Sequence, residues 1–262
     1  MIGKRRRREN LRRGLHKRDI MYNITINLGG VPVEISLEHA DYLNSYEDFL
    51  TENPPLATAA VPAEKIAAAR KFYDDGASDA YIEETEISAA AGTALLPFGR
   101  AVFHGAAFVW RQKAWLFAAP SGTGKTTQYR LWKLLFGDEI QMLCGDKPVI
   151  EIEHGGTTVF PSPWRGKENM GNRITAPLGG IIILEQEKEN SIRRLLPREA
   201  AGRIYLQFMF SRKTKEQLLA VCSLEHRLLS TVPVWLLKNR GDEASAMLCR
   251  ETIEKELYAD EI

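Results

Sequence analysis

The chain has 262 residues, of which 44% are hydrophobic and 26% charged, the composition of an ordinary globular protein with at least one buried core. Its formal net charge of +1 hides a basic N-terminus, because residues 1–19 hold nine Lys or Arg and two acidic residues. Three widely spaced cysteines argue against a disulfide framework or a zinc site, and no apolar run approaches the roughly 20 residues of a membrane helix. We therefore expect a cytoplasmic protein without a membrane partner.

Residues 1–20 are expected to form a disordered basic tail. Clusters of Lys and Arg can neutralise phosphates, but no aromatic residue that could stack on a base is interleaved with these charges. We therefore do not expect a nucleic-acid partner.

Residues 21–98 are expected to form a small α+β lobe. Apolar and polar residues alternate on both sides of Gly29-Gly30 over 22–37, which predicts a β-hairpin. Apolar residues at helical spacing predict helices over 38–50 and over 79–98, the second ending before Pro97. The segment between 51 and 65 holds three prolines and is expected to be a loop.

Residues 99–262 are expected to form an α/β core, because apolar strand-like runs alternate with helical patterns. Strands are predicted over 101–110, 114–119, 140–146, 178–186 and 233–237, a hairpin turns at Gly155-Gly156, and helices are predicted from 125, over 197–229 and over 242–257.

The segment APSGTGKT, residues 119–126, fits a phosphate-binding P-loop with alanine in place of the first glycine. Gly122 and Gly124 let backbone N–H groups turn toward phosphate oxygens, Lys125 can reach the β- and γ-phosphates, and the Thr126 hydroxyl can ligate Mg²⁺. An apolar strand enters the loop and a helix leaves it, which argues against an incidental glycine-rich turn. The nucleotide-binding residues that we expect are Ser121, Gly122, Thr123, Gly124, Lys125, Thr126 and Thr127.

A P-loop enzyme also needs a carboxylate for the metal or the attacking hydroxyl. Asp146 ends the strand that follows the P-loop helix, where α/β proteins gather their ligands, although a turn aspartate is the alternative. His104 lies 21 residues before Lys125, on a strand expected to pair with the one that feeds the P-loop. Alone, such a histidine is more often structural than catalytic.

The motifs FHGAAFVW, AWLFAAPSGTGKTT and LCGDKP together resemble the nucleotide-binding core shared by HPr kinase/phosphorylase and the phosphoenolpyruvate carboxykinases. They are closer still to short bacterial kinase homologues of that group, and the resemblance covers roughly residues 80–262. It implies that His104 and Asp146 occupy the positions of the family's histidine and of the aspartate that accepts the proton of the attacking serine.

Two positions depart from that family. Gly145 stands where the family has the first aspartate of a pair, and Pro163 stands where it has a metal-binding glutamate. Arg165 can stand for the family's phosphate-facing arginine, and Glu168 is a possible replacement for the glutamate. The resemblance therefore does not carry over the reverse phosphorylase reaction.

The segment SPWRGKENMGNR, residues 162–173, is a cationic loop with Arg165, Lys167 and Arg173. Such a loop can stabilise transition-state charge, or it can be a solvated connection. Arg212 and Lys213 are weaker candidates for the same role.

The sequence predicts a Mg·ATP-dependent kinase that transfers the γ-phosphoryl group to a hydroxyl, with a serine of a peptide or protein as the favoured acceptor. Lys125 and the loop amides would hold the phosphates, Thr126 and Asp146 the Mg²⁺, and Asp146 would accept the hydroxyl proton. His104 would support the site, and Arg165 would neutralise the developing charge.

Two alternatives stay open: a kinase for a small hydroxylated metabolite, and a nucleotide-binding regulator without transfer, which Gly145 favours. A homo-oligomer also stays open.

Overall fold

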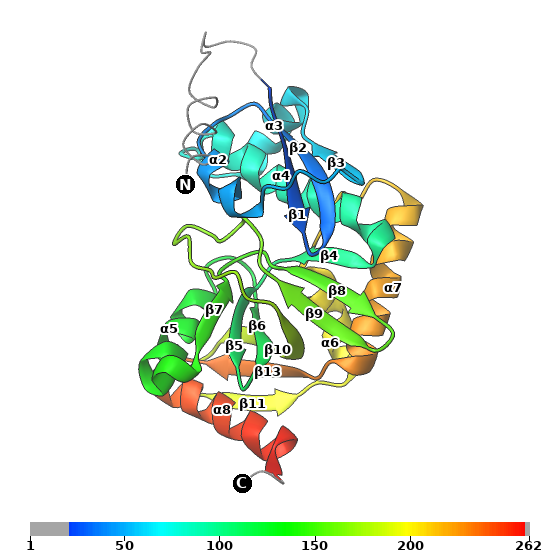
Figure 1. Cartoon of the computed structure of the whole chain (residues 1–262). Helices are drawn as coiled ribbons and strands as arrows, with labels where there is room; N and C mark the ends of the chain where they lie inside the picture. The colour runs from blue at the N-terminus through cyan, green and yellow to red at the C-terminus, as the bar shows by residue number, and fades with distance from the viewer. Residues whose placement is uncertain (1–20, 260–262) are drawn as a thin grey trace, which may run out of the picture.

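The computed structural model describes residues 21–259, and these form a three-stranded and a ten-stranded β-sheet with helices around them (Figure 1). The protein is thus a mixed α/β structure, as the sequence predicts. The tail predicted over 1–20 lies outside the described residues. Among the described helices, none is long and apolar enough to cross a membrane.

The three-stranded sheet belongs to the N-terminal part. Strands β1 (Tyr22–Leu28) and β2 (Val31–Leu37) form the predicted hairpin, and Gly29 and Gly30 turn with φ of 59° and 90°. Strand β3 (Ala57–Ala60) adds to β2 in parallel. The prediction of a loop over 51–65 is therefore wrong in part, since β2 offers an edge that pairs with a short segment of no strong propensity.

Helices pack against this sheet. They are α2 (Leu43–Tyr46), α3 (Ala63–Ala69) and α4 (Asp79–Leu95), with short 3₁₀ helices at Glu47–Phe49, Arg70–Phe72 and Leu96–Phe98. The long helix predicted over 79–98 is confirmed: the Ser78 hydroxyl caps its start by accepting the Tyr81 N–H, and Gly99 ends it with a φ of 70°. The helix predicted over 38–50 is shorter and begins at Leu43.

One half of the large sheet is antiparallel. It consists of β12 (Phe208–Met209), β4 (Arg100–Phe103), β8 (Val149–Glu153) and β9 (Gly156–Phe160), in this order. The other half is mixed and holds β10 (Ala176–Gln186), β6 (Lys113–Ala118), β5 (Ala106–Trp110), β7 (Gln141–Cys144), β13 (Val234–Asn239) and β11 (Ser191–Arg194). The long strand β10 joins them, because it pairs with β9 and with both β6 and β13.

Two sequence predictions are corrected in this sheet. The single strand predicted over 101–110 is two strands, β4 and β5, which break at His104-Gly105 because β4 pairs in one half and β5 in the other. The helical stretch predicted over 197–229 is α6 (Pro197–Tyr205), then β12, then α7 (Lys215–Thr231), whose start is capped by Thr214. The short strand β11 was not predicted.

Alternation along β6 explains the layers. Trp115 and Phe117 face the core beneath α5 (Lys125–Phe136) and α8 (Glu243–Leu257), whereas Leu116 and Ala118 face the core beneath α6 and α7. The N-terminal part covers the same sheet through α4, and its core includes Val102 from β4. The predicted boundary between residues 98 and 99 remains a prediction, since this core continues across it.

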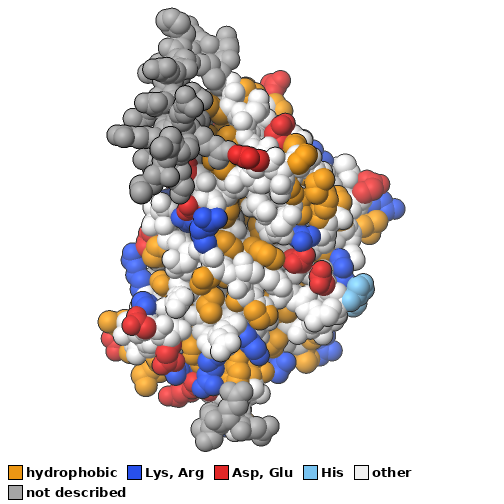
Figure 2. Space-filling view, viewed as in Figure 1, with side chains coloured by type: hydrophobic (Ala, Val, Ile, Leu, Met, Phe, Trp, Pro, Cys, Tyr) orange, Lys and Arg blue, Asp and Glu red, His pale blue; other side chains and the backbone are white. Residues whose placement is uncertain are grey.

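Figure 2 shows that the face seen in Figure 1 carries basic and acidic side chains mixed together over α5 and α8 at its lower end.

Candidate functional site

The loop predicted to hold phosphates joins β6 to α5. Strand β6 ends at Ala118 and α5 begins at Lys125, so the predicted strand–loop–helix order is confirmed. Gly122 and Gly124 adopt φ of 81° and 110°, values that L side chains rarely reach, and nothing lies within 4 Å of a Cβ added at Gly122. The two glycines therefore let the loop curl over open space.

The first turn of α5 supplies further donors, because the first N–H groups of a helix have no intrahelical partner. These N–H groups and the positive end of the helix dipole favour an anion at this point. Thr126 is half-buried here, while Ser121 and Thr127 are exposed. Gln128 fixes the turn, since its buried amide donates to Asn239 Oδ1 at 3.0 Å and to Ser245 Oγ at 2.6 Å.

Lys125 is buried at the centre of this loop. Its ammonium donates to the carbonyl oxygens of Ala119 at 2.9 Å and Pro120 at 3.4 Å, and it lies 3.1 Å from His104 Nε2. Burial lowers the pKa of Lys125, while the nearby Asp146 opposes that change and Lys147 adds to it. The lysine thus lies where the loop meets the end of β7.

Asp146 follows β7 by two residues, and the structure brings it to the same place. Its Oδ1 lies 3.5 Å from His104 Nε2, and its Oδ2 forms an ion pair with Lys147. Burial alone would raise its pKa, but hydrogen bonds and charge from His104 and Lys147 outweigh it and hold the pKa of Asp146 well below its usual range. Asp146 is therefore ionised across the physiological pH range.

His104 links the two. It occupies the break between β4 and β5 and not a position within one strand as expected. Its backbone N–H donates to Gln207 O at 2.7 Å. Its Nε2 can accept from Lys125, or, when protonated, donate to Asp146, but it serves only one of them at a time. Lys125, His104 and Asp146 thus form one connected polar centre.

The glycine that departs from the family pattern has a structural cause. A Cβ at Gly145 would lie 2.6 Å from Arg165 O and 3.1 Å from Met170 O, because the segment 165–170 crosses directly over this position. The Gly145 N–H donates to Met170 O at 2.9 Å. The first carboxylate of an aspartate pair therefore has no room here.

The cationic loop places its arginine against the N-terminal part. Arg165 Nη2 lies 3.2 Å from Asp48 Oδ2, and its guanidinium lies 5.5 Å from the centroid of the Phe49 ring. Glu168, the possible replacement carboxylate, pairs with Arg130 of α5 at 2.5 Å. Among the described residues, no contact joins Arg165 or Glu168 to the polar centre.

Two contributors beside the centre were not assigned from the sequence. Lys147 neutralises Asp146, and its N–H donates to Trp164 O. Glu84 of α4 accepts from Tyr46 Oη at 2.6 Å; burial raises the pKa of Glu84 to about 7, and the charge of Lys147 opposes the rise. Lys147 could have been found from the sequence because it follows Asp146 directly. Nothing in the local sequence indicates that Glu84 lies near the polar centre.

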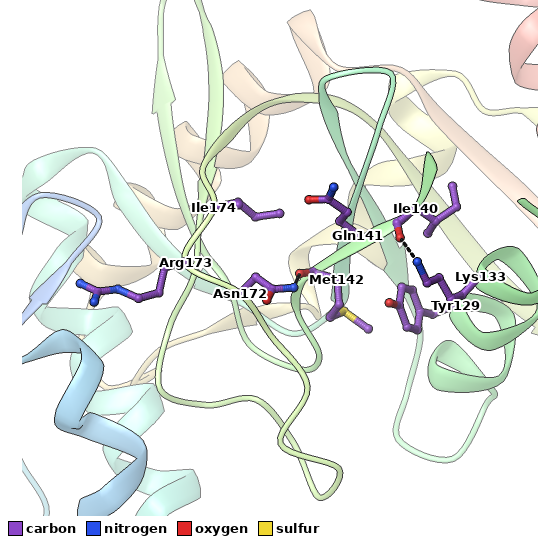
Figure 3. Close-up of a pocket in the computed structure, with 8 residues that line it drawn as sticks. All are labelled: Tyr129, Lys133, Ile140, Gln141, Met142, Asn172, Arg173 and Ile174. Atoms are coloured by element: carbon purple, nitrogen blue, oxygen red, sulfur yellow. Dashed lines mark hydrogen bonds between the residues drawn. The ribbon is translucent and has the colours of Figure 1, made fainter. Parts of the chain in front are cut away.

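An open pocket lies farther along α5, against the edge strand β7 (Figure 3). Lys133 turns back there to donate to Ile140 O at 3.1 Å, and Asn172 donates to Met142 O at 2.8 Å. Arg173, which also lines the pocket, points away from the other labelled residues. Arg173 therefore does not point toward Lys133 or Asn172.

The oxygen donors present suit Mg²⁺. This ion is usually bound by one or two carboxylates together with substrate phosphates and water. Thr126 in the first turn of α5 carries a hydroxyl, and Asp146 after β7 carries an ionised carboxylate. Among the described residues, no group of three or more His, Cys, Asp or Glu side chains could hold a metal by itself. A site of this kind is completed by the phosphates of the nucleotide.

No protein-family model matches this chain, and no curated protein matches it. Among solved structures, it is similar to the HPr(Ser) kinase/phosphatase from Coxiella burnetii, with a TM-score of 0.37 and 10% identity over 59% of this chain and 97% of that one. That structure belongs to the family that the motifs resemble.

Proposed function

We propose that the protein is a Mg·ATP-dependent kinase that transfers the γ-phosphoryl group to a hydroxyl, with a serine of a peptide or protein as the favoured acceptor. The observation that carries this proposal is the convergence of Lys125, His104 and Asp146 at the glycine loop where α5 begins. A phosphate-binding loop beside an ionised carboxylate is the arrangement that phosphoryl transfer needs.

In the proposed reaction the acceptor oxygen bonds to the γ-phosphorus while the bond to the β,γ-bridging oxygen breaks, and the hydroxyl proton passes to Asp146. The transition state of such transfers is loose, so Asp146 acts more by orienting the hydroxyl than by strong basicity, as its lowered pKa requires. When bound by Thr126 and Asp146, Mg²⁺ would neutralise phosphate charge.

Each of the other residues has a defined task in this proposal. Lys125 leaves the carbonyl oxygens of its own loop and binds the β- and γ-phosphates. His104 then holds Asp146 by donating from Nε2, since Lys125 no longer needs that nitrogen. Lys147, which pairs with Asp146, is the cation for the developing charge, a role that the sequence predicts for Arg165.

A nucleotide-binding regulator is the second candidate, and the specific observation behind it is the covered position of Gly145, which leaves the centre with one carboxylate of the pair. A kinase for a small hydroxylated metabolite would use the same centre and differ only in the acceptor.

The test is incubation of the purified protein with γ-labelled ATP and Mg²⁺ together with candidate acceptors encoded by neighbouring genes. The kinase predicts a labelled serine in an acceptor and stoichiometric ADP. Tight ATP binding without transfer to any acceptor would favour the regulator, and label on a small metabolite alone would identify the alternative kinase.

A further inference from the structure

A groove lies between α4 and the segment 206–213. Its volume is about 400 Å³, and its walls include Tyr73 and Glu86 on one side and Leu206, Phe210, Arg212 and Lys213 on the other. Neither Arg212 nor Lys213 is needed by the polar centre described above.

The segment that forms one wall of the groove also contacts His104. Strand β12 lies at the edge of the large sheet and pairs with β4, with Phe208 opposite Phe103, and the preceding Gln207 O accepts the backbone N–H of His104 at 2.7 Å. A chain that follows the segment away from Gln207 therefore starts beside the backbone of His104 and passes into the groove.

The groove is also rigid. Helix α4 lies directly on the backbone of β12, since a Cβ at Gly92 would meet Met209 O at 1.9 Å. The Ser211 N–H donates to Thr93 Oγ1 at 2.7 Å and fixes the segment where it leaves the strand. A ligand would meet a preformed surface and would lose little affinity to ordering it.

The charges of the groove are unbalanced. Glu86 already pairs with Lys65 at 2.8 Å and accepts from the Tyr73 hydroxyl at 3.3 Å. Arg212 lies over the Phe210 ring, 4.9 Å from its centroid, and within the part of the chain that the structure describes neither it nor Lys213 forms an ion pair. Two exposed cations thus remain beside an apolar wall in which Leu206 is 66% exposed.

We propose that this groove docks an acidic stretch of the acceptor peptide or protein, with the acidic side chains about five residues from the phosphorylated hydroxyl. The spacing follows from the segment itself: Arg212 stands five positions after Gln207, and an extended chain, which rises about 3.3 Å per residue, covers roughly 17 Å over five positions. An apolar residue of the acceptor would cover Leu206. This inference rests on the proposed kinase, because it names how that enzyme would recognise its acceptor.

The experiment uses synthetic peptides, each with one serine and a Glu-Glu pair placed three, five or eight residues away on either side, and matched peptides with Gln-Gln. Transfer from γ-labelled ATP is measured for the full-length wild type, for R212E/K213E and for K188E/K255E. Lys188 and Lys255 are exposed cations near β11 and in α8, at the opposite end of the molecule, and this control changes the net charge by the same amount (Figure 1).

The proposal predicts a kcat/KM at least tenfold higher for the peptide with Glu at about five residues than for its Gln match. R212E/K213E should lose that preference and gain one for peptides in which Lys-Lys replaces the Glu-Glu pair. The control variant K188E/K255E should keep the wild-type preference. Thermal melting checks that each variant is folded. An unchanged Glu preference in R212E/K213E would overturn the groove and leave the kinase standing.

If the wild type transfers phosphate to no peptide, binding of the fluorescent Glu peptide decides the groove independently of the kinase. Weaker binding by R212E/K213E than by K188E/K255E supports the proposal, and equal binding overturns it. A fluorescent single-stranded oligonucleotide is measured beside it. If the oligonucleotide binds the groove more tightly than the peptide does, the groove is a nucleic-acid surface and the proposal is wrong.

Discussion

Two loops of this protein carry a cation beside a glycine, and the two cations have different partners. Lys125 is surrounded by its own loop carbonyls, by His104 and by the end of β7. Arg165 reaches away to Asp48 and Phe49 of the N-terminal part. The first position follows from backbone geometry that a short motif encodes, whereas the second depends on partners more than 100 residues away. A short motif can therefore predict where a side chain lies when the motif also determines the local backbone conformation, as it does at Lys125.

Lys125→Ala removes the cation of the first loop and should have the largest effect on transfer. The ammonium is the cation that the loop holds at its centre, so transfer should be abolished and ATP binding weakened. Transfer and ATP affinity are measured on the same preparation. If Lys125→Ala turned over at the wild-type rate, the loop of residues 119–126 would not be the phosphate-binding site.

Gly145→Asp tests whether the family's aspartate pair can be restored. We expect a loss of stability on the order of 1–3 kcal/mol and no gain in transfer, because the new Cβ would lie 2.6 Å from Arg165 O. Gly155→Asp, at a turn where nothing lies within 4 Å of an added Cβ, is the control for a new surface charge. A Gly145→Asp protein as stable as the wild type and faster in transfer would contradict this explanation.

Arg165→Ala, measured beside Asp48→Ala, tests whether the cation of the second loop stabilises the fold or acts in the reaction. Because the two side chains pair, both variants should lose stability, and transfer by either should fall only about tenfold, well short of the 10²–10⁴ that a general base contributes. A hundredfold loss of transfer in Arg165→Ala alone, at an unchanged melting temperature, would instead establish that Arg165 acts in the chemistry as the sequence predicts.

Glu84→Gln should have the smallest effect, visible only through pH. The pKa of Glu84 is raised from 4.5 to about 7 in the folded protein, so the folded state binds this proton more tightly and the wild type loses stability as pH rises through that window. Glutamine still accepts from Tyr46 but does not titrate. At pH 8 the variant should melt a few degrees higher, about 2–4 °C per kcal/mol gained, and at pH 4 no higher. Equal pH profiles would show that Glu84 is not buried as described.

The elements found from the sequence are those that carry their own signal. The hairpin of residues 22–37, the helix α4 and the strand–loop–helix around Lys125 follow from turn residues, from apolar residues at helical spacing before Pro97, and from a glycine loop. The strands β3, β11 and β12 are short, and their pairing partners decide their conformation, so no local pattern could predict them. The helical reading across β12 failed for this reason.

The candidate site divides in the same way. Lys125 follows a glycine loop and Asp146 follows the end of a strand, so the spacing of the motifs in the sequence predicts both positions. The break at His104, the cover over Gly145 and the approach of Glu84 come from segments that meet only in the folded chain. Their contributions could not be predicted without knowing the packing of α4 and of the segment 165–170.

The measurement that tests the central claim most directly compares Asp146→Asn with the wild type in two assays on one preparation, ATP binding and transfer to the acceptor found by label incorporation. The substitution keeps the size of the side chain but removes the charge that, in the proposed reaction, binds Mg²⁺ and accepts the proton. Transfer should fall by at least about 10²–10⁴-fold, while ATP affinity falls far less because the loop amides and Lys125 remain. Transfer at the wild-type rate would contradict the account, since the ionised carboxylate at the end of β7 would then have no part in the reaction.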